Sequence, residues 1–307
     1  MKRKPWSSSF FLLQFIFFAP RAFAGLESSA LEASKEVSKA VQYTAEQIDL
    51  TLAGERYTDH ANESQISVSQ LVTWTEGGVF KQSTDLGVNL RLPNVEKHWQ
   101  LRFSTYDEEQ EQRDMSQRRV RTTPRDREYG TSLFFLQKLG NVKVTFQPKL
   151  QLRNPLEMSY VLSFESSAEE NKGERYFRVQ PKFQLYADAI KGTGEYFSLN
   201  FIYRLRKTME VALENEEEYR EKDLHFTTRH GVTYDYILDK KNKIGTALIA
   251  SSSNHDFHLD EWDYNVSYGH ELYKKLLNMT VSPFWNFARG DHFKGKVGIS
   301  FNLIASF

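Results

Sequence analysis

The sequence predicts an all-β protein, a transmembrane antiparallel up-and-down β-barrel with a short N-terminal helix. Three observations predict it. Apolar and polar residues alternate through most of residues 61–307, no apolar run after residue 24 is long enough for a spanning helix, and the chain ends in one long alternating segment. A strand crosses a bilayer at a tilt with about 9 to 11 residues, whereas strands of soluble sheets average about 5 to 6. The alternative fold is a soluble all-β sandwich or a soluble barrel with the same alternation, which the long strands disfavour.

The terminal segment has the clearest alternation. Counting back by two from the last residue gives Phe307, Ala305, Leu303, Phe301, Ile299 and Val297. A final amphipathic strand that ends in Phe resembles the C-terminal assembly signal of bacterial outer-membrane β-barrel proteins, including the porin-like class, with Phe301, Leu303 and Phe307 as its matching residues. The resemblance implies a bacterial outer-membrane location, contact with outer-membrane lipid and lipopolysaccharide, and recognition by the barrel-assembly machinery. It covers the last strand specifically and the rest of the chain by architecture.

Residues 1–24 have the features of a secretory signal peptide. Three basic residues at positions 2–4 precede an apolar run over 10–20, and Ala22-Phe23-Ala24 fits a cleavage site. We therefore expect cleavage after Ala24. A membrane anchor is the alternative, but it requires about 20 apolar residues, roughly twice the length of this run.

Composition limits the remaining classes. The chain has 307 residues, no cysteine and a formal net charge of zero. Without cysteine neither a disulfide framework nor a lipid-modified cysteine is expected. The balanced charge gives no sign of a nucleic-acid partner, and the sequence contains no nucleotide-binding or metal-ligand motif, so we expect no cofactor and no metal.

Residues 25–60 are predicted to form a separate N-terminal segment, ahead of a barrel over 61–307. Leu26, Ala30, Val37, Val41 and Ile48 fall on one face of an amphipathic helix of about 20 residues. Two positions are open for this helix. It rests at the periplasmic mouth of the barrel, or it enters the barrel as a plug or a partner-binding arm.

Alternation places the strands of the barrel. The expected strands are 65–76, 85–92, 99–106, 129–138, 142–152, 158–164, 177–185, 197–205, 224–238, 244–253, 262–272, 277–287 and the terminal segment. The expected outer loops are 107–128, 166–174, 207–222 and 253–260. The first has an acidic run followed by a basic one, and the third has a second acidic run. The strand count is odd, whereas bacterial single-chain barrels have an even number, so we predict about 12 strands with 14 as the alternative.

The polar faces of these strands supply the functional prediction. The lumen-facing basic residues are expected to be Arg91, Arg102, Lys143, Lys149, Arg178, Lys182, Arg204, Arg206, Arg229, Lys294 and Lys296. The acidic residues on the same faces are fewer: Asp85, Asp235, Asp263 and Glu271. Excess positive charge in a confined lumen concentrates anions, which predicts a porin-like diffusion channel for small anionic solutes. The alternative is a barrel filled by ion pairs, a non-conducting structural or adhesion protein.

A hydrolase is the second alternative. Ser253, His255, Asp256 and His258 combine a nucleophile, two bases and a carboxylate near the end of a strand. The H-x-S-N arrangement of outer-membrane phospholipases and the acidic pairs of omptin-like proteases are absent. Such residues occur together by chance in polar loops, so the sequence gives no firm catalytic site.

Overall fold

The computed structural model describes residues 24–54, 64–94, 99–106, 108–119, 121, 128–152, 156–189, 192–254, 258–273 and 276–307. The strands are β1 (Gln65–Thr75), β2 (Val79–Arg91), β3 (Trp99–Ser104), β4 (Gly130–Leu139), β5 (Val142–Gln151), β6 (Glu157–Ser166), β7 (Ala168–Lys172), β8 (Arg175–Asp188), β9 (Gly192–Arg206), β10 (Met209–Arg220), β11 (His225–Ile237), β12 (Asn242–Ser253), β13 (His258–Tyr273), β14 (Leu277–Ala288) and β15 (Lys296–Ser306). The helices are α2 (Ala24–Ala53), α3 (Glu108–Gln112), α4 (Met115–Arg119) and the 3₁₀ turn η1 (Arg289–Asp291). Within the described part of the chain, no helix is long and apolar enough to cross a membrane.

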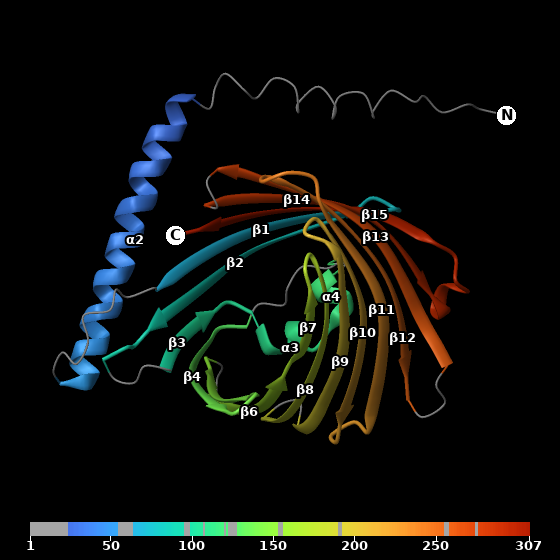
Figure 1. The fold of residues 1–307 in the computed structure, drawn as a ribbon, viewed down its shortest axis with the longest axis horizontal. Coiled ribbons are helices and arrows are strands. Elements are labelled where there is room, and N and C mark those ends of the chain that lie inside the picture. Colours follow the sequence, from blue (N-terminus) through green and yellow to red (C-terminus); the bar gives the residue numbers. More distant parts are fainter. Residues whose placement is uncertain are drawn as a thin grey trace.

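The strands close into one antiparallel barrel (Figure 1). β6 and β7 both pair with β8 and continue each other across Ser167, so they form one interrupted strand and the 15 strand segments make a 14-strand barrel. The first and last strands pair over Ser67–Thr75 and Gly298–Ser306, and Phe307 exchanges backbone hydrogen bonds of 3.0 and 2.8 Å with Ile66. Because the sheet closes in this way, it has no unpaired edge strand.

The two faces of the sheet differ in polarity. On β5, Phe146 points outward with 41% of its surface exposed, while the next residue, Gln147, points into the barrel and is only 5% exposed. The same alternation places Ile299 and Phe301 of β15 on the outside and Ser300 on the inside. The barrel is therefore apolar outside and polar inside, the reverse of a soluble domain.

The rim that carries the start of β1 and the end of β15 is called the terminal rim here, and the opposite one the far rim. Strand order places the β7–β8, β9–β10 and β11–β12 turns on the terminal rim. The segment between β3 and β4 starts from the far rim. Because the number of strands is even, the start of β1 and the end of β15 lie at the same rim.

The strand number is the higher of the two predicted values because one expected loop is wrong. Residues 207–222 contain β10, which pairs with β9 and β11 along its whole length. The strand was missed because its outward face also carries polar residues, Asn215 and Glu217, which hides the two-residue period. Residues 166–174 were also expected to be an outer loop and instead contain β7 and the turn to β8 on the terminal rim.

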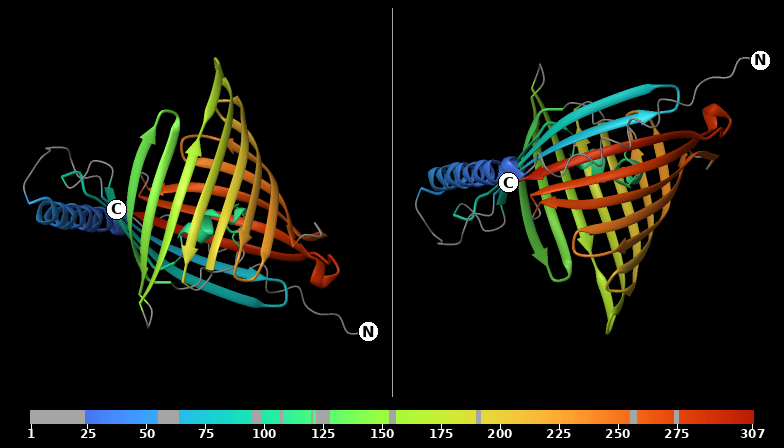
Figure 2. Two further views of the ribbon diagram at one scale, coloured as in Figure 1. Left: turned by 90° about the horizontal axis from the view of Figure 1, so that it is seen from below. Right: turned by 90° about the horizontal axis from the view of Figure 1, so that it is seen from above.

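The predicted N-terminal helix is present as α2, and its described part lies outside the lumen. Val41 and Ala45 pack against Leu90, which points outward from β2, with Ile48 and Ile66 alongside. The Asp49 carboxylate accepts hydrogen bonds from the backbone N–H and the side-chain amide of Asn94, at 2.9 and 2.8 Å. Figures 1 and 2 show α2 beside β1 and β2 on the outer surface of the barrel.

We predict that Asp49→Ala loosens α2 from the barrel. The substitution removes the acceptor of the buried Asn94 amide, and an unsatisfied buried donor costs about 1 to 3 kcal/mol. Hydrogen exchange of the Asn94 amide in the refolded protein is expected to accelerate by at least about tenfold. Lys35→Ala, at an exposed position of the same helix, is the control. Equal protection in the two variants would contradict the docking role of Asp49.

Candidate functional site

The segment between β3 and β4 folds back into the barrel. Its two short helices, α3 and α4, lie inside the ring of strands in Figure 1. Met115, the first residue of α4, is fully buried against Ala247, Ile249 and Phe284 on the lumen face of β12 and β14. A side chain at Gly231 would collide with the Met115 sulfur, so β11 needs a glycine at this point. The prediction that 107–128 forms a solvated outer loop is therefore wrong, because the described part of this segment is docked in the lumen.

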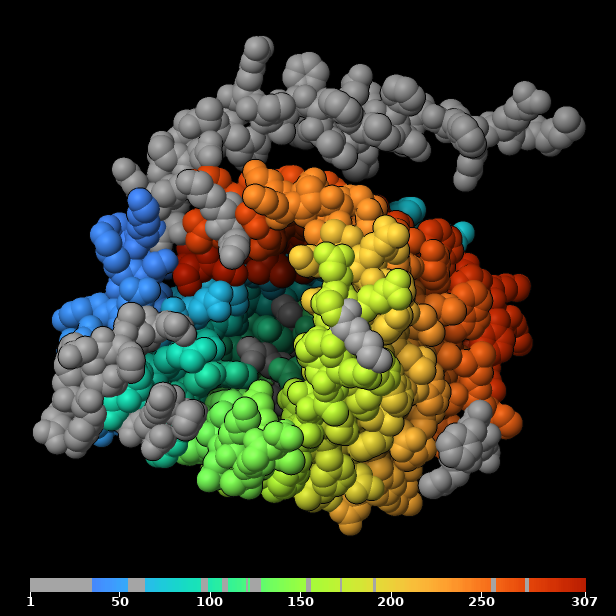
Figure 3. Space-filling view, viewed as in Figure 1, coloured from blue at the N-terminus to red at the C-terminus, as the bar shows by residue number. Residues whose placement is uncertain are grey.

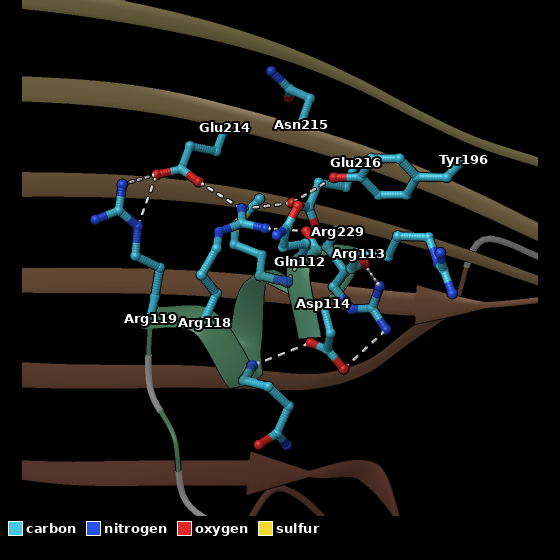
Figure 4. A network of polar contacts seen from close by, with 12 residues as sticks. Gln112, Arg113, Asp114, Arg118, Arg119, Tyr196, Glu214, Asn215, Glu216 and Arg229 are labelled. Atoms are coloured by element: carbon cyan, nitrogen blue, oxygen red, sulfur yellow. Dashed lines mark hydrogen bonds and ion pairs between the residues drawn. The ribbon is translucent and has the colours of Figure 1, made fainter. Parts of the chain in front are cut away.

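Arginine–carboxylate contacts hold this docked loop to β10 (Figure 4). Arg118 contacts Glu214 at 3.0 Å and Glu216 at 2.6 Å, and Arg119 Nε donates to Glu214 at 3.0 Å. Glu216 also accepts hydrogen bonds from the Met115 backbone N–H and from the Tyr196 hydroxyl, at 3.0 and 2.9 Å. Glu214 and Glu216 are 3% and 1% exposed. Their burial is possible because each charge is neutralised and hydrogen-bonded.

Further contacts fix the turn between α3 and α4. Arg113 lies 3.5 Å from Glu218 and stacks over the Tyr186 ring at 4.2 Å. Arg229 of β11 donates to the Arg113 carbonyl at 3.2 Å and lies 3.5 Å from Asp114. The loop is therefore bound from several strands at once, and it closes off the β10–β13 side of the lumen.

The sequence missed the acidic partner of this loop. Glu210, Glu214, Glu216 and Glu218 alternate along the lumen face of β10, where a solvated acidic loop was expected. Their presence changes the charge balance of the interior, because the predicted lumen set contained none of them. The signal that could have found them is the spacing of two within the acidic run, which fits a strand with carboxylates on one face.

A cavity of about 130 Å³ remains between the docked loop and the opposite wall. Its wall is formed by β3–β6 and β8, and Gln112 of α3 faces it from the loop. Three cationic side chains line it, namely Arg102, Lys143 and Lys182, with Glu165 as the acidic one. The amides of Gln147 and Gln184 complete a polar surface. The space-filling view shows the hollow mouth of the barrel between β1–β3 and β7 (Figure 3).

Several predicted lumen residues have partners in the barrel. Arg102 stacks on Phe134 at 4.3 Å and Lys143 lies 3.9 Å from Glu165. Lys149 forms a buried ion pair with Glu128 at 2.9 Å. Strand register puts Arg91, Lys182 and Arg229 on the lumen face of β2, β8 and β11.

The remaining predicted lumen residues lie toward the rims. Arg178 contacts Glu169 at 2.6 Å and Arg204 contacts Glu210 at 3.1 Å, both close to the terminal rim. Arg206 ends β9 on the same rim. Lys296 begins β15 and pairs with Asp291, while Lys294 precedes the strand. The terminal strand was expected to begin at Lys294 and thus starts two residues later than predicted.

The predicted catalytic candidates are only partly described. His255 and Asp256 lie outside the described residues. Ser253 donates a hydrogen bond to Asp260, and His258 stands opposite Ser253 in the β12–β13 pairing without a side-chain hydrogen bond to it. In the described ranges no group of three or more His, Asp or Glu side chains is arranged to hold a metal ion.

Comparisons with known proteins find similarity only among solved structures. No protein-family model and no curated protein matches the chain. The DcaP channel of Acinetobacter baumannii has 8% identity and a TM-score of 0.49, covering 80% of this chain and 97% of its own. OccK11 of Pseudomonas aeruginosa has 9% identity and a TM-score of 0.47, covering 80% of this chain and 96% of its own. A KdgM porin has 10% identity and a TM-score of 0.38, covering 78% of this chain and 99% of its own. With TM-scores below 0.5, these similarities carry no argument about what this chain does.

We predict that Arg118→Ala frees the docked loop. The substitution leaves Glu216 buried without its main cation, and breaking a buried ion pair in this way costs about 3 kcal/mol or more. Limited trypsin digestion of the refolded protein is expected to cut at the remaining arginines of 113–125 at least about tenfold faster than in the wild type. Arg289→Ala, which removes a half-exposed arginine from a 4.0 Å pair with Asp260, is the control. Unchanged cleavage of 113–125 would show that the pair does not hold the loop.

Proposed function

We propose that the chain is an outer-membrane diffusion channel in which small anionic solutes pass between the docked loop and the wall formed by β3–β8. The observation that carries the proposal is the charge around the remaining cavity, where Arg102, Lys143 and Lys182 face a single acidic side chain, Glu165. Fixed charge in a narrow passage shifts the local potential and enriches ions of the opposite sign.

A membrane location is supported by the outer surface. Large outward side chains remain exposed along the strands, among them Phe197, Leu213, Val232, Leu248 and Phe301. Lipid cannot hydrogen-bond to the backbone, so a spanning sheet must close on itself, and this sheet does. The signal peptide expected over 1–24, with cleavage after Ala24, fits export to a Gram-negative outer membrane, and residues 1–23 lie outside the described part of the chain.

The terminal strand supports the proposed assembly route. Phe301 and Leu303 point outward on β15, and Phe307 is hydrogen-bonded to the first strand at the closure. We propose that the barrel-assembly machinery recognises this strand before it pairs with β1. Outer-membrane lipid and lipopolysaccharide are the surroundings proposed for the finished barrel.

The anion preference rests on how the charges are separated. The four carboxylates of β10 are turned toward arginines of the docked loop or toward Arg204, so their charge is compensated locally. On the opposite wall, Lys143 and Glu165 are 3.9 Å apart, and both are more than 40% exposed. The described residues that line the cavity include three cationic side chains and one carboxylate, although the chain as a whole has no net charge.

A non-conducting structural or adhesion barrel is the second candidate. It is favoured by the density of the docked loop, in which Met115, Glu214 and Glu216 are almost completely buried. In that case the cavity beside the loop would be a packing defect and would not connect the two rims. Conductance separates the two candidates.

We predict that the refolded mature protein forms anion-selective channels in planar bilayers. In a potassium chloride gradient, Arg102→Gln with Lys182→Gln is expected to lower the chloride-to-potassium permeability ratio by at least about twofold, because two fixed positive charges leave the passage. Lys240→Gln with Lys241→Gln is the matched control, since it removes the same charge from an exposed turn.

Three other results would change the assignment. Cation preference in the wild type would refute the charge argument. Conductance that occurs only after deletion of 25–60 would contradict the position of α2 outside the lumen. Silence with and without this segment would favour the non-conducting barrel.

A further inference from the structure

A second hollow lies at the terminal rim, apart from the cavity beside the docked loop. It has a volume of about 690 Å³ and is formed by β7, β8 and β9, where the β7–β8 hairpin extends beyond its neighbours (Figure 2). Outward residues form most of its lining, and Tyr176, whose hydroxyl bonds to Glu210 on the lumen side, contributes at its edge. The other lining residues are Arg175, Phe177, Tyr203, Leu205, Arg206, Glu170 and Glu174. None of the lumen contacts that hold the docked loop involves these residues.

The strand register explains why the hollow faces outward. Phe177 pairs with Tyr203, and they are 41% and 39% exposed on the outer face, with Phe201 stacked beside Phe177 at 6.4 Å. Arg175 lies two residues from Phe177 on β8, and Leu205 two residues from Tyr203 on β9, so all four share one face. The apolar outer surface therefore ends, at this rim, in Arg175. Arg206 follows Leu205 where the β9–β10 register shifts, and it lines the same hollow.

These arginines differ from their neighbours in charge compensation. Arg178 and Arg204, on the lumen face of the same strands, pair with Glu169 and Glu210. Arg175 and Arg206 form no ion pair within the described part of the chain.

The two acidic residues of the hollow also have partners. Glu174 lies 3.5 Å from Lys207 in a largely exposed pair, and Glu170 makes a further contact within the chain. Two guanidinium groups are thus left available beside an exposed aromatic pair. Such a pair of charges in a hollow is suited to an anion, and not to a further cation.

We infer that this hollow binds the head group of an anionic phospholipid in the leaflet at the terminal rim. Guanidinium groups bind phosphate oxygens through paired, charge-assisted hydrogen bonds, and aromatic side chains sit at the boundary between acyl chains and head groups. The phosphate lies between Arg175 and Arg206, and the acyl chains follow Phe177 and Leu205. The inference rests on the membrane location proposed above, although it is independent of conduction.

The test is lipid retention by the full refolded chain. The protein is reconstituted in vesicles of phosphatidylethanolamine with a minor fraction of phosphatidylglycerol and extracted in mild detergent. The lipid that stays bound is counted by native mass spectrometry. The wild type is expected to retain phosphatidylglycerol in preference to phosphatidylethanolamine. Arg175→Gln with Arg206→Gln is expected to reduce that preference at least about tenfold. Lys240→Gln with Lys241→Gln, on another turn of the same rim, should retain it.

Each outcome has one meaning. Equal loss of the preference in the control variant would show that the overall charge of the rim, and not this hollow, retains the lipid. No preference in the wild type would show that the hollow is not a lipid site. Either result overturns the inference. Competition by millimolar inorganic phosphate in place of lipid would assign the arginines to a free anion and overturn the lipid assignment. Failure of the wild type to co-float with the vesicles would instead refute the membrane location itself. Unchanged conductance of the double arginine variant is expected, because the hollow is outside the passage.

Discussion

The arrangement of the interior depends on the burial of two carboxylates on β10. Glu214 and Glu216 are 3% and 1% exposed, and an unpaired charge at such positions would cost several kcal/mol. The neighbouring strands offer Glu216 the Tyr196 hydroxyl and Glu214 the Thr233 hydroxyl. Arg118 and Arg119 bring the charge from the β3–β4 segment, so the docked position of that segment follows from the acidic face of β10.

That single requirement also makes the lumen asymmetric. When the loop is bound to the β10–β13 side, Arg118 and Arg119 pair with carboxylates of β10. The space that remains adjoins the wall that contains Arg102, Lys143 and Lys182. The described residues that line this space include three cationic side chains and one carboxylate, Glu165, although the chain as a whole has no net charge. Small residues at the contact, Gly231 and Ala247, give Met115 the room to approach the wall. Packing and electrostatics therefore select the same loop position.

The sequence predicts the barrel because most strands have one apolar and one polar face, as β5 and β15 do. It could not predict β10, because the outer face of this strand carries the polar residues Asn215 and Glu217 and its inner face is acidic. Apolar and polar residues therefore do not alternate over this part of the strand. The loop position was equally hidden, because Arg118 and Glu216 are 98 residues apart and each charge run, taken alone, has the composition of a solvated segment. Pairing between distant charges is a property of the closed barrel and not of either segment.

Four arginines of β8 and β9 show the same limit at the level of single residues. Moving by one residue along a strand changes the face, so Arg178 and Arg204 meet carboxylates of the lumen while Arg175 meets the outer surface. Simple alternation along β9 would place Arg206 on the lumen face with Arg204. The pairing of β9 with β10 shifts register at Met209, however, and Arg206 lines the outer hollow with Leu205. Charge can therefore be assigned to the lumen from sequence in the middle of a strand, whereas at the rims a single bulge decides which phase a side chain contacts.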